Sequence, residues 1–197
     1  MEAAEITKTL TEKFGEEIIK ADETTSSLGF NVPVENLLDV LTFLRDDSSF
    51  AMNFLNCITA LDLQGLPKAE TEDLRTVYHL YSYVHRHELS INCDVPRDNP
   101  VIPSVTGLWA AAVWQEREAY DLLGIVYEGH PNLTRILLPT EFEGHPLRKD
   151  WKEGTHVMGI STQRDTPVEL LKFFHEVMGV EVPDEIRADV QIAAEES

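Results

Sequence analysis

The chain has 197 residues, 43% of them hydrophobic, which is enough for one folded domain with an extension. Its formal net charge of −19, from 35 acidic and 16 basic residues, argues against direct binding to nucleic acid or anionic lipid, because both require a positive surface. No apolar run approaches the roughly 18 to 20 residues of a membrane span, and the acidic N-terminus lacks the apolar core of a signal peptide, which predicts a cytosolic protein.

The first two thirds of the chain predict helices followed by strands. Apolar residues recur at helical spacing over residues 5–20 and again over residues 34–45. Residues 50–63 and 74–83 are rich in apolar residues and indicate largely buried strands. Residues 89–95 alternate apolar and polar without exception, so we expect a strand with one side facing solvent.

Two cysteines, Cys57 and Cys93, are too few for an ordinary iron–sulfur cluster or a cysteine-rich zinc site. Each lies in an apolar segment, which predicts buried, reduced thiols. Three prolines between Pro96 and Pro103 predict a loop without regular structure. A helix is then expected from about residue 106 or 109 to Leu123, where the following glycine ends it.

The order of these elements predicts an α+β fold, with helices on a mixed β-sheet in a two-layer domain over residues 1–124. Residues 125–152, here called the EGHP arm, lack periodicity and are predicted to be mainly irregular. Such an arm is usually held by packing on its own domain or on another chain. Residues 153–197 form a C-terminal extension, in which a capping box predicts one further helix at about 166–178.

The helix before the EGHP arm places charged residues next to an apolar stretch. Glu116 falls within the apolar stripe, and Arg117 lies four residues before Asp121, at a spacing that allows an ion pair along the helix. Three carboxylates against one guanidinium need further cations, and Arg135, Arg148 and Lys149 are the nearest in the sequence. The alternatives are a solvated end of a core helix and a buried network that ties the helix to the arm or to a partner. Paired carboxylates also occur in acid–base catalysis, but nothing near these resembles a substrate pocket.

The tetrapeptide EGHP occurs twice, with its histidine at His130 and at His145. Glycine before and proline after each histidine predict a bent corner with an imidazole at the apex. We expect each imidazole to bond carboxylates or backbone nearby. A zinc site is the alternative, but zinc needs three or four ligands, some of them on rigid elements. Residues 130–152 carry four basic and three acidic residues, a local net charge of +1 on a strongly acidic chain.

Three stretches, EREAYDLLGI at 116–125, GHPNLTRIL at 129–137 and FEGHPLRKD at 142–150, carry a family resemblance. They closely resemble the signature of the thirty-kilodalton subunit of respiratory complex I, which is the C subunit of the bacterial NADH-quinone oxidoreductase. The resemblance covers roughly residues 30–151. Thr134 departs from it, because family members usually carry a basic residue there.

The resemblance implies a non-redox structural subunit in the hydrophilic arm of the complex, docked on the subunit that helps form the quinone site. It implies no cofactor in this chain, with FMN and iron–sulfur clusters expected in partner subunits. The complex passes electrons from NADH to quinone and couples this transfer to ion translocation. It implies a peripheral position on the cytoplasmic face of the cell membrane, with membrane contact only through the complex.

Two alternatives remain at this level. One is the equivalent subunit of a membrane-bound hydrogenase or an F420H2 dehydrogenase, and the other is a freestanding metal-dependent enzyme that uses His130 and His145. On the main interpretation no residue is catalytic and none binds a metal or a cofactor. The residues expected to serve structure and partner docking are Glu116, Arg117, Glu118, Asp121, His130, Arg135, His145, Arg148, Lys149 and Asp150.

Overall fold

The computed structural model describes residues 3–22, 28–67, 69, 71–157 and 160–161. It divides into two compact units between Lys152 and Glu153, and each unit is considered by itself. In the second unit, β8 (His156–Val157) and β9 (Ile160–Ser161) pair in antiparallel fashion. The helix predicted at 166–178 lies outside the described residues. Within the described residues, no helix combines the length and the apolar character that a membrane crossing requires.

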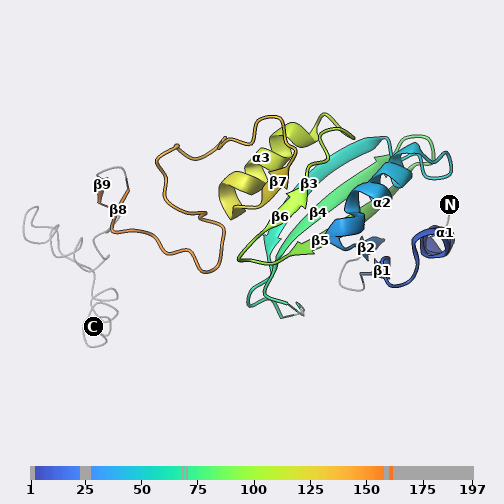
Figure 1. Ribbon diagram of the computed structural model, residues 1–197, viewed down its shortest axis with the longest axis horizontal. Helices are drawn as coiled ribbons and strands as arrows, with labels where there is room; N and C mark the ends of the chain where they lie inside the picture. The colour runs from blue at the N-terminus through green and yellow to red at the C-terminus, as the bar shows by residue number, and fades with distance from the viewer. Residues whose placement is uncertain (1–2, 23–27, 68, 70, 158–159, 162–197) are drawn as a thin grey trace, which may run out of the picture. The chain divides into compact units, whose positions relative to one another are not determined.

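The first unit is built on a mixed five-stranded sheet with the order β1-β2-β5-β4-β3 (Figure 1). β2 runs parallel to β5, and the other neighbouring strands are antiparallel. This arrangement confirms the predicted α+β fold. The strands are β1 (Lys20–Ala21), β2 (Gly29–Asn31), β3 (Phe54–Asp62), β4 (Leu74–Ser82) and β5 (His87–Val95).

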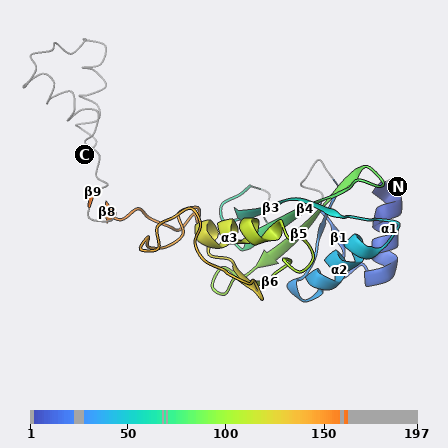
Figure 2. The same ribbon diagram turned by 90° about the horizontal axis from the view of Figure 1, so that it is seen from above.

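Helix α2 (Val34–Asp46) covers one face of this sheet (Figures 1 and 2). Its apolar stripe packs into the core together with alternate residues of β4 and β5. Helix α1 (Ala3–Phe14) is shorter than predicted because Gly15, with φ +93°, ends it. The buried residues of the α2 stripe are Leu37, Val40, Leu41 and Leu44.

The expectation that one side of β5 faces solvent is wrong. Ser90 and Asn92, on the polar side of the strand, are 3% and 2% exposed. The side-chain amide of Asn92 donates to Asp22 Oδ2 at 2.7 Å and to Asn31 Oδ1 at 2.9 Å. Asp22 follows β1, and Asn31 lies on β2, the strand next to β5. These polar residues bond Asn92 on the face that the alternation alone suggests is exposed to solvent.

Two further predictions of local structure are corrected. The proline-rich loop contains β6 (Val101–Pro103), which pairs in parallel with β7 (Val126–Glu128) at the start of the EGHP arm. Pro103 is tolerated there because it is the last residue of a strand at the edge of a sheet. The thiol of Cys93 is buried, which raises its pKa to about 12, whereas Cys57 is only half-buried.

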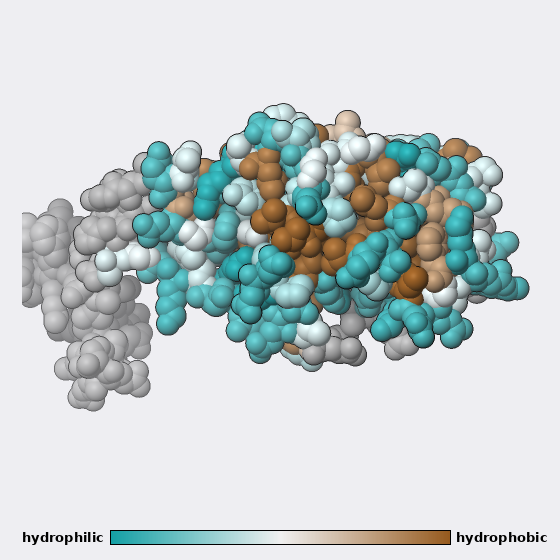
Figure 3. All heavy atoms as spheres, viewed as in Figure 1, coloured by the Kyte–Doolittle hydropathy of each residue, from teal (hydrophilic) through white to brown (hydrophobic). Residues whose placement is uncertain are grey.

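Helix α3 (Ala112–Leu123) follows β6 and lies along β3, the edge strand of the main sheet. Its Gln115 accepts a hydrogen bond from the backbone N–H of Ile58 at 2.7 Å, so the helix covers part of an otherwise unpaired strand edge. Figure 3, drawn from the same side as Figure 1, shows apolar residues grouped in the middle of this unit with hydrophilic residues around them. The position of α3 fixes where the EGHP arm can run.

Candidate functional site

Glu116 is the buried carboxylate of α3, as its place in the apolar stripe predicts, with 0% exposure. It accepts hydrogen bonds from Ser104 Oγ at 2.6 Å and from the backbone N–H of Val105 at 2.7 Å. Burial raises the pKa of this carboxyl above its ordinary value, and the two hydrogen bonds only partly oppose the rise. Glu116 therefore connects α3 to the end of β6, and no cation pairs with it within the described part of the chain.

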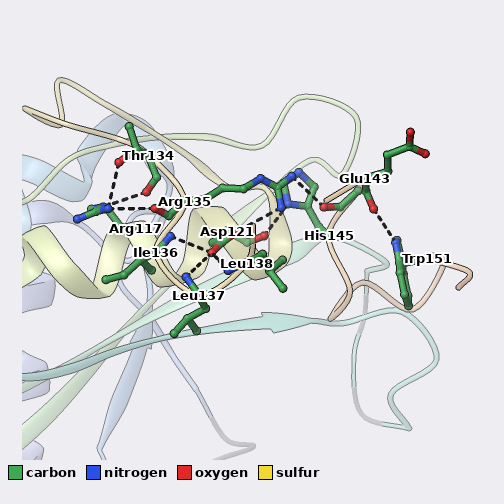
Figure 4. Close-up of polar contacts among 11 residues, drawn as sticks. Arg117, Asp121, Thr134, Arg135, Ile136, Leu137, Leu138, Glu143, His145 and Trp151 are labelled. Carbon is green, nitrogen blue, oxygen red and sulfur yellow. Dashed lines mark hydrogen bonds and ion pairs between the residues drawn. The ribbon is translucent and has the colours of Figure 1, made fainter. Parts of the chain in front are cut away.

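Asp121 organises the middle of the EGHP arm. Its Oδ2 accepts hydrogen bonds from three consecutive backbone N–H groups, and its Oδ1 pairs with Arg135 Nη1 at 3.2 Å. Burial acts to raise the pKa of the carboxyl, but the three N–H groups and the guanidinium outweigh it, so the pKa lies below the ordinary value. The three donors are Ile136 at 3.0 Å, Leu137 at 2.7 Å and Leu138 at 2.9 Å (Figure 4).

The spacing of Arg117 and Asp121 allows an ion pair, but the two side chains do not form one. Its Nε donates to the carbonyl oxygen of Thr134 at 2.9 Å, and its Nη2 donates to Thr134 Oγ1 and to the carbonyl oxygen of Arg135, both at 3.0 Å. Its guanidinium also lies 5.1 Å from the ring centre of Trp114. Arg135 satisfies Asp121, which leaves Arg117 free to hold the backbone of the EGHP arm. Thr134, the departure from the family pattern, supplies two of the three acceptors, its carbonyl oxygen and its hydroxyl.

The first EGHP corner binds the beginning of α3. His130 Nδ1 accepts a hydrogen bond from the backbone N–H of Asn132, so Nε2 carries the proton and donates to the carbonyl oxygen of Val113 at 3.0 Å. Both ring nitrogens are therefore engaged by backbone groups, as expected of a structural corner.

The second EGHP corner caps the C-terminus of α3. The last carbonyl oxygens of a helix have no partner within the helix and need donors from elsewhere. Here three donors reach backbone carbonyl oxygens of the last turn. His145 Nδ1 donates to the carbonyl oxygen of Asp121 at 2.9 Å, and the backbone N–H of Leu147 donates to that of Leu122 at 3.1 Å. Arg148 Nε donates to the carbonyl oxygen of Leu123 at 2.6 Å. The N–H of Gly124 serves the remaining carbonyl, that of Tyr120. The corner thus satisfies the end of the helix from outside.

Two glycines allow this close approach. Gly124 has φ +74°, and a Cβ there would lie 2.6 Å from the His145 ring and 2.9 Å from the Arg148 guanidinium. Gly144, in the second EGHP unit, has φ +80°, and a Cβ there would lie 2.8 Å from the Trp151 ring. Both positions need the left-handed backbone and the missing side chain. Gly124 and Gly144 therefore have a packing role, whereas a Cβ at Gly129, in the first EGHP unit, would meet no atom within 4 Å.

The end of the EGHP arm is held by a carboxylate that sequence reasoning missed. Asp62, at the end of β3, pairs with Arg97 and accepts a hydrogen bond from the backbone N–H of Lys149 at 2.7 Å. Arg97 also pairs with Asp150 at 3.3 Å. Burial acts to raise the pKa of Asp62, but Arg97 and the two backbone donors from Lys149 and Gln64 lower it below the ordinary value. No local pattern marks Asp62, because its partners lie 35 and 87 residues away.

The predicted site residues therefore form one structure around α3, with three exceptions, one of which is Asp150, whose side chain pairs with Arg97 beside Asp62. Glu118 is exposed, and the side chain of Lys149 is also exposed while only its backbone bonds Asp62. His130 and His145 do not come together: they bind carbonyl oxygens eight residues apart on α3, or about 12 Å along its axis. Within the described residues, no group of three or more His, Cys, Asp or Glu side chains is placed to hold a metal ion.

Comparison with known proteins shows the family to which the chain is similar. Residues 30–157 match the family described as "Respiratory-chain NADH dehydrogenase, 30 Kd subunit". The NADH-quinone oxidoreductase C subunit of Roseiflexus sp. (strain RS-1) is 40% identical over 149 residues, which are 75% of this chain and 83% of that protein. The C subunit of Moorella thermoacetica is 45% identical over 121 residues, which are 61% of this chain and 77% of that protein. The C subunit of Salinispora arenicola is longer, and a match of 40% identity spans 56% of it.

Two solved structures share the fold. A trypsin-resistant fragment of Nqo5 aligns with a TM-score of 0.58 and 29% identity, over 68% of this chain and all of that chain. A chain of an archaeal respiratory membrane complex, the membrane-bound sulfane sulfur reductase, aligns with a TM-score of 0.61 over 92% of this chain and 96% of that chain, and its 22% identity supports the fold alone. The chain belongs to the family of the 30 kDa subunit of the respiratory-chain NADH dehydrogenase.

Proposed function

We propose that this chain is a non-redox structural subunit of an NADH-quinone oxidoreductase, and that it docks on the subunit that helps form the quinone site. The complex transfers electrons from NADH to quinone and couples the transfer to ion translocation. FMN and the iron–sulfur clusters belong to partner subunits, and this chain carries neither. It sits at the cytoplasmic face of the cell membrane and contacts the membrane only through the complex.

The observation that supports a structural role is how the motif residues use their hydrogen bonds. Asp121, Arg117 and His145, which carry the chemically versatile side chains of the motif, bond backbone amides and carbonyls of the EGHP arm and α3. A general acid or a metal ligand needs a polar atom free for the reacting group. Side chains that bond backbone atoms instead stabilise the conformation of the EGHP arm and α3. This role fits a subunit that holds other subunits in position.

Two relatives of the complex remain as alternatives. An equivalent subunit of a membrane-bound hydrogenase or an F420H2 dehydrogenase would share the fold and the EGHP arm, because the arm has a structural role and does not bind the electron donor. The C subunits of NADH-quinone oxidoreductases at about 40% identity favour the NADH-linked complex. A freestanding metal enzyme using His130 and His145 has no geometric support, since the two rings lie at different ends of α3.

Affinity purification from native membranes tests the proposal. A tagged chain should bring down the flavin and iron–sulfur subunits of an NADH-quinone oxidoreductase. If hydrogenase subunits co-purify in their place, the proposal that NADH is the electron donor is wrong. The variant Arg117→Ala should lower the amount of assembled complex and its quinone reductase activity in parallel, because it releases the arm backbone at Thr134 and Arg135.

Arg45→Ala is the matched control for this variant. Arg45 lies on α2, where it pairs with the exposed Asp46 and donates to the carbonyl oxygen of Leu108 at 3.4 Å. Neither contact involves the EGHP arm, so assembly should be normal. If Arg117→Ala assembles normally and loses turnover selectively, the residue acts at the quinone site and the structural role is wrong.

A further inference from the structure

The EGHP arm presents apolar side chains on a backbone that is held in place. Ile136 and Leu137 donate their backbone N–H groups to the buried Asp121, and the two residues are 38% and 60% exposed. Figure 4 shows the Leu137 side chain pointing away from that carboxylate. A single exposed apolar residue needs no explanation. Ile136 and Leu137, however, lie together on a stretch of backbone that the Asp121 carboxylate, with 0% side-chain exposure, holds in place. We call these two residues the apolar tip.

An aromatic residue and a cation extend this tip. Arg117 bonds the carbonyl oxygen of Arg135, directly before Ile136, and its guanidinium lies 5.1 Å from the ring centre of Trp114, which is 60% exposed. Arg117 therefore lies between the Trp114 ring and the backbone of the residue that precedes Ile136. Tryptophan and arginine are the residues most enriched at the energetic centres of protein interfaces, and groups held rigid before binding lose less entropy on association.

The charges at this surface specify what can cover it. Arg117 uses Nε and Nη2 for the arm, while its Nη1 donates no hydrogen bond within the described residues. None of the ion pairs among the described residues includes Arg117, Arg148 or Lys149. These cations lie on or beside the EGHP arm of a chain with a net charge of −19. A partner with carboxylates is complementary here, although it would be repelled by most of the remaining surface.

We propose that Trp114, Arg117, Ile136 and Leu137 form a docking surface for another protein of the complex, which offers an apolar pocket with a carboxylate beside it to bind Arg117 Nη1. This inference rests on the proposed function and names the partner chemistry of the same site. Tryptophan, arginine and leucine also gather at membrane surfaces, but anionic lipid headgroups are repelled by the charge of the whole chain.

The decisive comparison uses two exposed apolar residues of the full-length chain. Leu137→Ser removes the more exposed side chain of the apolar tip, keeps the backbone N–H that Asp121 binds, and should leave the melting temperature of the purified chain unchanged. Val84→Ser, in the turn between β4 and β5 and 65% exposed, is the control of similar exposure away from the surface. Each variant is tagged and purified from native membranes, and the co-purifying subunits are quantified.

Leu137→Ser should reduce the co-purifying complex at least tenfold, because the apolar pocket of the partner would then receive a hydroxyl, while Val84→Ser should match the wild type. Recovery should fall further with rising salt for Leu137→Ser than for the wild type, because the charge pair then holds the contact alone. Equal recovery of Leu137→Ser and wild type overturns this surface and leaves the proposed function intact. A wild-type chain that brings down no oxidoreductase subunit overturns the proposed function itself.

A lipid target is tested with the same proteins. Vesicles of phosphatidylcholine and phosphatidylglycerol are mixed with the purified wild-type chain and floated on a density gradient. The chain should stay at the bottom. Flotation of the wild type that Leu137→Ser abolishes would show that the surface binds membrane, and the protein partner proposed here would be wrong.

Discussion

Asp121 shows how one side chain can set the path of an irregular segment. Its carboxylate receives three consecutive backbone N–H groups and one guanidinium, so four donors converge on a single buried group. The three consecutive N–H groups turn toward the carboxylate, which stabilises this stretch of the arm without any regular secondary structure. The spacing of Arg117 and Asp121 predicted an ion pair, but a helix surface is only one of the environments that compete for each side chain.

The variant Asp121→Asn should lower the free energy of unfolding of the purified chain by about 3 kcal/mol near neutral pH, measured by urea denaturation. The change removes the charge that pairs with Arg135 and leaves a partly buried guanidinium unpaired. Asp39→Asn, at an exposed position of α2, is the control and should change stability by less than about 0.5 kcal/mol.

The same variant has a pH signature. The folded pKa of Asp121 lies below its ordinary value of 3.8, so its stabilising contribution is present above that value and is lost as the pH falls through the folded pKa. The difference in unfolding free energy between wild type and Asp121→Asn should therefore shrink on acidification below about pH 4. A difference that stays constant to low pH would show that Asp121 is not ionised in the folded chain.

At the scale of elements, α3 depends on the EGHP arm at both ends. The first EGHP corner binds the carbonyl oxygen of Val113, and the second supplies the donors for the last turn through His145, Leu147 and Arg148. A twelve-residue helix is marginal by itself in water and gains its stability from packing and caps. Helix and arm are thus one structural unit, although the sequence presents them as a regular and an irregular segment.

We expect His145→Ala to speed amide hydrogen exchange in the last turn of α3 by roughly fivefold, the equivalent of about 1 kcal/mol for one lost hydrogen bond to the carbonyl of Asp121. Hydrogen-exchange mass spectrometry of peptides covering residues 118–124 measures this. Lys149→Ala is the control in the same arm, because it keeps the backbone N–H that Asp62 binds. Equal exchange in both variants would mean that water caps the helix as well as His145 does.

At the scale of the whole molecule, the end of the EGHP arm is tied to the main sheet. Asp62 at the end of β3 joins Arg97, which follows β5, and the backbone of Lys149. Its side chain is 1% exposed, so the group is costly to bury unless both partners are present. This junction brings residues from three distant parts of the sequence together and closes the first unit just before its boundary at Lys152.

Removing the cation at this junction should release the arm end. In Arg97→Ala, trypsin should cleave after Lys149 at least tenfold faster, because a buried carboxylate without its guanidinium favours opening and cleavage follows the open population. Mass spectrometry of the fragment ending at Lys149 separates this event from cleavage elsewhere. In Arg45→Ala, which leaves the junction intact, the rate of that cleavage should equal the wild-type rate.

The sequence by itself determined the α+β class, the helix at 34–45, the approximate positions of β3, β4 and β5 and the burial of Glu116, because each depends on periodicity that neighbouring residues carry. Only the tertiary structure decided that Arg117 holds Thr134 instead of Asp121, that the polar side of β5 is covered, and that Asp62 anchors Lys149. These outcomes depend on partners between 17 and 87 residues away. A side chain takes the best donors or acceptors that the fold brings to it, and nothing within a few residues of its own position records which these will be.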